Sequence, residues 1–253
     1  MPTAAALRSQ IELALEQRIP AALTPIKRSI REVAATRIAE VDRLLDGGLP
    51  VGAISEITGP NSSGRTSLAV AFVAECIRSG SVCAWVDASD SFDPESATSG
   101  GIVLSRLLWV RCAQGKSLSA GKPWGSLDQA LRATDLLLQA GGFASIVLDL
   151  GDIAPQHGCR IPLATWFRFR QSADRVRCAL VVLGLQSYAQ SSAAAVLRCS
   201  AVQADPVGNT VLREANYRVE RERERATQLI SRARKPPAST WSAQAAWERE
   251  RCL

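Results

Sequence analysis

The chain has few of the residues on which metal and disulfide chemistry depend. Its 253 residues include one histidine, His157, and seven cysteines that form no C-x-x-C pair. A single imidazole does not make a histidine-based zinc site, so we expect His157 to be an ordinary loop residue. The cysteines are odd in number and five of them lie in apolar surroundings, which favours core residues in a reducing cytosol over a disulfide framework.

Long hydrophobic runs are also missing. No uninterrupted stretch of roughly 18 apolar residues occurs, so we expect no membrane span. The first residues carry Glu12, Glu16 and Arg18 at helical spacing and have no cleavage site, which argues against a signal peptide. We therefore expect a cytoplasmic protein, with association with the nucleoid as a further option. The 47% hydrophobic content suffices for the core of one α/β domain.

Lysine is scarce, since only four of the 30 basic residues are lysines. The net charge of +6 favours an acidic partner such as nucleic acid. The excess of arginine leaves open whether an arginine at a lysine position reflects composition or function.

Apolar runs alternate with helical patterns along the chain. The continuous runs predict a mostly parallel sheet with helices on both faces. Strands are expected at 51–59, 82–88, within 102–114 (LLWVRC), at 144–150 and at 178–186, with an exterior strand at 211–220. Helices are expected at 3–18, 39–47, 67–80, 126–142, 162–175 and 191–199. We divide the chain into an N-terminal helix and linker (1–38), an α/β core (39–217) and an arginine-rich C-terminal tail (218–253).

A glycine-rich loop lies between the first core strand and its helix. Gly59, Gly64 and Thr66 satisfy the phosphate-loop pattern G-x-x-x-x-G-[basic]-[ST] in the strand–loop–helix context that it requires. Backbone N–H groups and the helix N-terminus favour a phosphate there, and the Thr66 hydroxyl is a candidate ligand of Mg²⁺. The predicted nucleotide-binding residues of this P-loop (59–67) are Gly59, Pro60, Asn61, Ser62, Ser63, Gly64, Arg65, Thr66 and Ser67.

Arg65 stands where the pattern normally has lysine. Its guanidinium keeps the charge but is a broad planar fork, so the replacement is not conservative. Three interpretations remain open: a working ATPase, a nucleotide binder without turnover, and a loop kept only as architecture.

Four segments resemble, in order, motifs of the bacterial RecA recombinase core. They are GGLPVGAISEITGPNSSGRTSLA (47–69), VCAWVDASDSFDP (82–94), SIVLDL (145–150) and ALVVLGLQ (179–186). The resemblance implies a RecA-like P-loop NTPase core that uses ATP and Mg²⁺. It further implies that Asp93 lies on the adenine side, that Asp149 holds the Mg²⁺ shell and that Gln186 senses the nucleotide. Asp149 can equally be a strand-end carboxylate bonded to local backbone.

The departures from that pattern concern catalysis and DNA contact. The glutamate that orients the attacking water in the family falls on Ser89, which is no general base without help. The base-stacking aromatic falls near Ser96, and the segments after Asp149 and Gln186 are short. We therefore assign no catalytic residue, leave open whether the chain is an enzyme, and expect little or no hydrolysis.

A short RecA-like core of this kind is similar to the ImuA proteins. That resemblance implies an accessory role in the SOS response to DNA damage and in error-prone translesion synthesis. The implied partners are a polymerase-type protein similar to ImuB, RecA and single-stranded DNA. An active ATP-dependent single-stranded-DNA recombinase and a cell-division inhibitor of the SulA type are the alternatives.

The C-terminal tail combines basic residues with tryptophan. Arg232, Arg234 and Lys235 precede two prolines, and Trp241 and Trp247 follow. Such residues are candidates for contact with a partner protein or with single-stranded bases. The alternative is a solvated or disordered segment without such a role.

Overall fold

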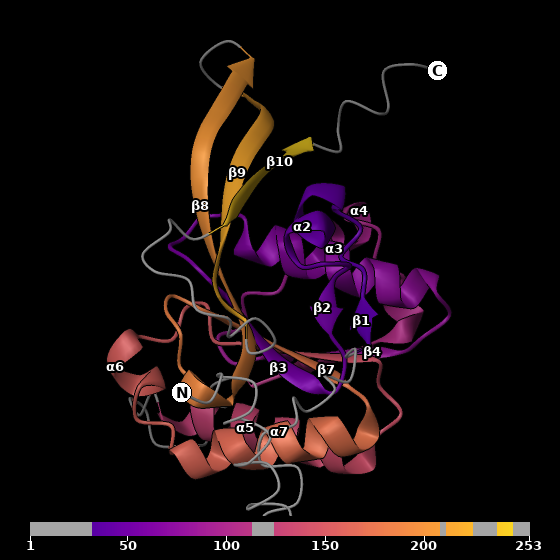
Figure 1. Cartoon of the computed structure of the whole chain (residues 1–253), viewed down its shortest axis with the longest axis vertical. Helices are drawn as coiled ribbons and strands as arrows, with labels where there is room; N and C mark the ends of the chain where they lie inside the picture. The colour runs from indigo at the N-terminus through magenta and orange to yellow at the C-terminus, as the bar shows by residue number, and fades with distance from the viewer. Residues whose placement is uncertain (1–31, 113–123, 208–210, 225–236, 245–253) are drawn as a thin grey trace, which may run out of the picture. The chain divides into compact units, whose positions relative to one another are not determined.

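An eight-stranded sheet forms the framework of the chain (Figure 1). The computed structural model describes residues 32–112, 124–207, 211–224 and 237–244, so the expected helix at 3–18 lies outside the described residues. The strands are β3 (Ala53–Thr58), β4 (Cys83–Asp87), β5 (Leu107–Arg111), β6 (Ser145–Asp149), β7 (Ala179–Gly184), β8 (Ala193–Val207), β9 (Val211–Glu224) and β10 (Ala238–Gln244). Their order is β10-β9-β8-β3-β7-β6-β4-β5. A separate two-stranded sheet pairs β1 (Val33–Ala34) with β2 (Leu49–Pro50).

Helices cover both faces of the sheet (Figure 1). They are α2 (Ala39–Leu44), α3 (Arg65–Arg78), α4 (Pro94–Ser99), α5 (Trp124–Ala140), α6 (Pro155–Gly158) and α7 (Leu163–Val176). The α2 and α3 helices pack in one hydrophobic cluster, with Phe72 fully buried, and α5 and α7 pack in the other, with Trp166 fully buried. Within the described part of the chain, the search for a helix long and apolar enough to cross a membrane found none.

The five strands β3, β7, β6, β4 and β5 run parallel. All residues of β3, β4, β6 and β7 are buried, because each of these strands has helices on both sides. This confirms the predicted mostly parallel α/β sheet. It also confirms that the continuous apolar runs are strands covered by helices on both faces. The carboxyl ends of these strands lie at one edge of the sheet, where α/β folds place their ligands.

The segment 191–199 was expected to be helical, and this prediction is wrong. A short 3-10 turn spans Gln190–Ser192, and β8 then pairs in parallel with β3. Three alanines and a leucine favour a helix locally, but propensity is a weak prior that tertiary contacts override. Ala193 and Leu197 are fully buried in β8, one in each hydrophobic cluster.

The structure also differs from the expected division at residue 217/218. That boundary falls inside β9, which is antiparallel to both β8 and β10. Val219 is fully buried and Trp241 is 8% exposed. Residues 218–224 and 238–244 therefore belong to the sheet and contribute to its core. The arginines and Lys235 at 232–235 lie outside the described residues.

A buried carboxylate fastens the connection after β7 to the central strand. Glu56 lies in β3 and is 1% exposed. Its Oε1 accepts hydrogen bonds from the backbone N–H groups of Tyr188 (2.6 Å) and Ala189 (2.8 Å), and its Oε2 accepts one from the Ser187 hydroxyl. A buried charge is tolerated only when it is bonded in this way. Glu56 thus fixes the chain between β7 and β8 relative to the strand that leads into the P-loop.

Replacing Glu56 tests this anchor. Glu56→Ala leaves two backbone N–H groups without an acceptor, so we expect a loss of about 2–4 kcal/mol in the free energy of unfolding. Glu56→Gln keeps an acceptor of the same shape and is expected to lose about half as much or less. Urea unfolding followed by circular dichroism measures both. Equal stability of the alanine variant and the wild type would contradict the anchor.

Candidate phosphate-binding site

The P-loop connects β3 to α3 through two glycines in conformations that other residues rarely adopt. Gly59 has φ +155° and Gly64 has φ +85°. A Cβ at Gly59 would lie 2.4 Å from the carbonyl oxygen of Cys199, and one at Gly64 would lie 2.7 Å from the ring of Tyr217. Because backbone and a packed ring leave no room, both positions require glycine. The loop is therefore built as the sequence pattern predicts.

A cavity of about 280 Å³ opens over the P-loop and the start of α3. Residues 61–67 line it, together with Asp149 at the end of β6. Ser91, Gly151, Asp152 and Tyr217 complete the lining. The structure thus brings seven of the nine predicted loop residues and the predicted Mg²⁺-side carboxylate together at one site, whereas Gly59 and Pro60 are not among the lining residues.

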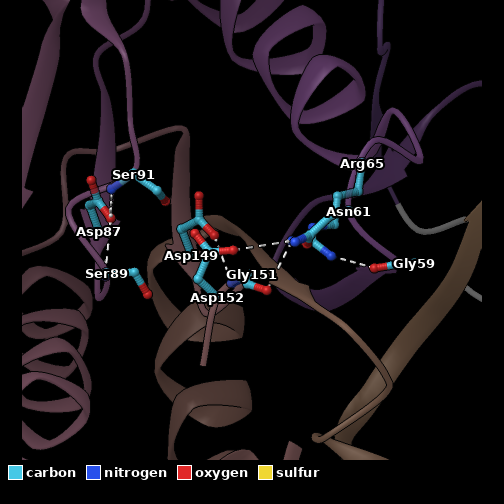
Figure 2. A network of polar contacts seen from close by, with 9 residues as sticks. All are labelled: Gly59, Asn61, Arg65, Asp87, Ser89, Ser91, Asp149, Gly151 and Asp152. Carbon is cyan, nitrogen blue, oxygen red and sulfur yellow. Dashed lines mark hydrogen bonds and ion pairs between the residues drawn. The ribbon is translucent and has the colours of Figure 1, made fainter. Parts of the chain in front are cut away.

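The guanidinium of Arg65 is held by main-chain and side-chain oxygens, as Figure 2 shows. Its Nη1 donates to the carbonyl oxygen of Gly59, and its Nη2 donates to the Asn61 side chain (3.1 Å) and to the carbonyl oxygen of Gly151 (2.9 Å). Arg65 is 7% exposed. A long ion pair of 4.0 Å to the half-exposed Asp152 adds little. Arg65 therefore ties the P-loop to the loop that follows β6.

Asp149 lies beside this arginine and is 5% exposed. Its Oδ1 accepts a hydrogen bond from the backbone N–H of Gly151 (2.9 Å). Burial raises the pKa of Asp149 from 3.8 to about 6, against the opposing effects of the Gly151 hydrogen bond and of Arg65. Both interpretations of Asp149 left open above have support, because it is bonded to local backbone and also lines the cavity.

The donors present fit the phosphates of a nucleotide. The loop has positive φ at two glycines, as the phosphate-loop pattern requires, and the buried hydroxyl of Ser63 has no partner in the described part of the chain. Thr66 is exposed and lines the same cavity as Asp149. The described residues contain no group of three or more His, Cys, Asp or Glu arranged to hold a metal ion. Mg²⁺ would therefore need phosphate oxygens and water besides Thr66 and Asp149.

The turn after β4 is organised by Asp87, a residue that sequence reasoning did not single out. Asp87 is fully buried and accepts hydrogen bonds from the backbone N–H groups of Ser89, Ser91 and Phe92. Ser89 has a buried hydroxyl without a partner among the described residues. Three backbone donors on one carboxylate fix the turn and hold Ser89 in a defined position, but Ser91 and not Ser89 lines the cavity.

Asp90 is engaged away from this edge. Its carboxylate forms a bidentate ion pair with Arg111 at the end of β5, with both N···O distances 2.6 Å. Arg111 lowers the pKa of Asp90, mainly through these hydrogen bonds. The Asp90 carboxylate is therefore held by Arg111 and does not take the place of the missing glutamate.

Two residues assigned by resemblance lie outside the cavity lining. Asp93 is the N-cap of α4 and accepts hydrogen bonds from the backbone N–H groups of Glu95 and Ser96 and from the Ser96 hydroxyl. Gln186 is exposed and its Nε2 donates to the sulfur of Cys159 (2.9 Å). Neither residue is among those that line the cavity. Their assignments to adenine and to nucleotide sensing stay predictions.

Of the residues in the C-terminal tail that were assigned to partner or DNA contact, the structure describes only Trp241. Trp241 was expected to be an exposed anchor, but it lies in β10, is 8% exposed and packs in the hydrophobic core. Its ring stacks on Tyr217, with centroids 4.7 Å apart. The alternation of polar and apolar residues from Thr240 to Gln244 is the signal that indicates a strand here. Trp247 and the basic residues at 232, 234 and 235 lie outside the described residues.

Comparisons with known proteins identify the relatives of this fold and site. Residues 22–157 match the family model of the RecA N-terminal domain. The proteins RecA of Brucella canis and of Brucella suis are each 28% identical over 196 residues, which cover 65% of this chain and 51% of the relative. The chain therefore spans about half the length of these curated relatives. The crystal structure of the RadB recombinase has a TM-score of 0.56 at 19% identity, covering 76% of this chain and 90% of that one, which shows a shared fold.

The raised pKa of Asp149 predicts how stability depends on pH. Between about pH 4 and 6 the folded chain holds a proton on this carboxyl that the unfolded chain releases, so this group lowers stability as the pH rises. In buffer with a chelator, Asp149→Asn should be more stable than the wild type by about 2 kcal/mol at pH 7.5, and the difference should vanish near pH 4. Urea unfolding across this range measures the effect. Asp128→Asn, the same change at an exposed position of α5, is the control, and a constant difference at all pH values would contradict the assignment.

Proposed function

The chain belongs to the RecA N-terminal domain family, and from this premise we propose that it is a RecA-like accessory protein of DNA repair and recombination. In this proposal it binds a nucleotide at the P-loop without efficient hydrolysis and acts through partner proteins. The observation that carries the proposal is the position of Arg65, whose guanidinium is bonded to the carbonyl oxygens of Gly59 and Gly151.

A lysine at this position is a point charge on a flexible stem and is free to follow a phosphate. The Arg65 guanidinium instead has three of its donors engaged with protein oxygens on two loops. Each such hydrogen bond contributes about 0.5–1.5 kcal/mol. A phosphate that approaches the Arg65 guanidinium must therefore compete with the three protein oxygens that already accept from it. This favours binding through backbone N–H groups over stabilisation of charge in a transition state.

The second support is the lack of a group to orient the attacking water. Ser89 falls where the resemblance expects glutamate, and a hydroxyl does not accept a proton from water near neutral pH. Asp90 is paired with Arg111. General-base catalysis contributes about 10²–10⁴-fold, so its loss alone reduces turnover by that order.

The chain's own residues would hold a nucleotide and Mg²⁺ as follows. Backbone N–H groups of the P-loop and the N-terminus of α3 bind the phosphates, the Thr66 hydroxyl contacts the ion, and Asp149 holds water around it. Bound ATP would supply a triphosphate. In this proposal the binding of ATP, rather than its hydrolysis, is what changes the state of the protein.

The biological role we propose is error-prone translesion synthesis in the SOS response. Its support is the ordered set of RecA-like motifs together with the net charge of +6. The partners are a polymerase-type protein similar to ImuB, RecA and single-stranded DNA. The contacts are assigned to Arg232, Arg234, Lys235 and Trp247, whereas Trp241 is withdrawn from this set because it is buried.

Nucleotide hydrolysis by the purified chain tests the central claim. We expect the wild type to bind ATP but to release phosphate at the rate of the protein-free control, with or without single-stranded DNA. The double variant Arg65→Lys/Ser89→Glu should hydrolyse at least about tenfold faster than the wild type, because it frees the cation and restores a base. Arg78→Lys, the same change at an exposed position of α3, is the matched control. DNA-stimulated hydrolysis by the wild type would contradict the proposal and favour an active recombinase.

A truncation tests the claim that the C-terminal residues contact a partner protein. The bounds of β9 and β10 determine which residues can be removed without deleting part of the sheet. Removal of residues from 218 onwards would delete half of β9 and all of β10, so the informative deletion begins after Gln244. Deletion of 245–253, combined with substitution of the basic residues 232, 234 and 235 by glutamine, should abolish capture of a polymerase-type partner. Unchanged thermal stability of the variant is the control. Full retention of binding would show that the contacts lie elsewhere.

A further inference from the structure

Tyr217 forms a wall of the cavity that the P-loop motif does not include. It lies on β9, far from the loop in sequence, and it is the one aromatic residue among the described residues that line the cavity. A Cβ on Gly64 would lie 2.7 Å from two carbons of the Tyr217 ring. The ring therefore rests on the backbone of the P-loop where α3 begins.

Trp241 fixes the position of this ring from behind. Tyr217 and Trp241 are register partners in the antiparallel β9–β10 pair. Their ring centroids are 4.7 Å apart and the planes are inclined at 37°. Since Trp241 is 8% exposed and belongs to the hydrophobic core, it holds Tyr217 in place before any ligand arrives. A ring positioned in advance loses little side-chain entropy on binding.

The opposite side of the site provides no ring. Ser96 stands where the resemblance places an aromatic residue, and its hydroxyl donates to Asp93 within the cap of α4. Neither Ser96 nor Asp93 lines the cavity. A planar base near the phosphates would therefore find its aromatic contact on β9 rather than on α4.

The size and charge of the site agree with a ligand that carries such a base. The cavity of about 280 Å³ is at the lower limit of ligand pockets, so a phosphate chain would fill it and a nucleoside would lie at its mouth. Tyr217 is half-buried, which leaves part of its side chain accessible there. Burial also raises the pKa of Tyr217, so no phenolate charge faces the phosphates.

We propose that Tyr217, held by Trp241, stacks on the base of a nucleotide whose phosphates occupy the P-loop. Tyr217 thereby makes the site selective for a nucleoside polyphosphate over an inorganic polyphosphate of the same length. This inference rests on the proposed nucleotide binding and assigns the specificity of that site to the C-terminal strands. Because a ring stacks on any base, selectivity among the bases is weak.

Calorimetric titration of the full chain with ADP and with pyrophosphate, each with Mg²⁺, tests the inference. The two ligands carry the same number of phosphorus atoms and differ in the nucleoside. The wild type should bind ADP more tightly than pyrophosphate. Tyr217→Ala should weaken ADP binding by roughly five- to 150-fold, the range of one base–aromatic stack, and should leave pyrophosphate affinity within about twofold.

Three further variants separate stacking from other effects. Tyr217→Phe keeps the ring and should keep the preference for ADP. Tyr217→Leu keeps an apolar side chain against Trp241 and Gly64 but has no ring, so it should lose the preference for ADP. This variant replaces Tyr217→Ala in the test if the alanine variant does not fold. Phe167→Ala removes an aromatic side chain that is 46% exposed on α7 and should change neither affinity.

The outcomes distinguish this inference from the proposed function. If pyrophosphate binds and the alanine and leucine variants keep the preference for ADP, the site exists but Tyr217 does not contact the base, and the inference is overturned. If Tyr217→Ala bound both ligands more tightly than the wild type, the Tyr217 ring would be shown to obstruct the cavity. That result would also overturn the inference. If the wild type binds neither ligand, the P-loop holds no phosphate, and the proposed nucleotide binding fails together with the inference.

Discussion

The structure depends on the complete burial of one strand, β3, between two parallel neighbours. β3 pairs with β7 on one side and with β8 on the other, and none of its six residues is exposed. β3 is the direct neighbour of β8, the strand at which the sheet changes from parallel to antiparallel pairing. It leads directly into the P-loop and carries Glu56, which holds the chain after β7. The geometry of the site is therefore set by a strand that cannot shift without disrupting both hydrophobic clusters.

The cation of this P-loop has a different role from the one that the sequence pattern implies for it. Its charge is satisfied by oxygens of the protein before a ligand binds. The loop keeps its backbone geometry while its cation joins two loops to each other. The guanidinium charge that phosphoryl transfer would require is thereby engaged with protein oxygens, whereas the two glycines of the loop keep the backbone conformation of the pattern.

The sequence predicted the parallel sheet, its helical layers and the P-loop, because continuous apolar runs and glycine spacing are local signals. It did not predict β8, where alanines favour a helix in isolation and only pairing with β3 decides. The cavity wall formed by Tyr217 was also missed, because it depends on the register between β9 and its neighbours. Asp87 and Gly151 act through backbone hydrogen bonds that no residue pattern specifies.

The bonding of Arg65 also affects how the chain can evolve. A return to lysine at this position would restore the family pattern but would leave the carbonyl oxygens of Gly59 and Gly151 without a shared donor, because one ammonium nitrogen replaces a fork that spans both. Lysine is therefore disfavoured structurally at this position unless the surrounding loops change as well.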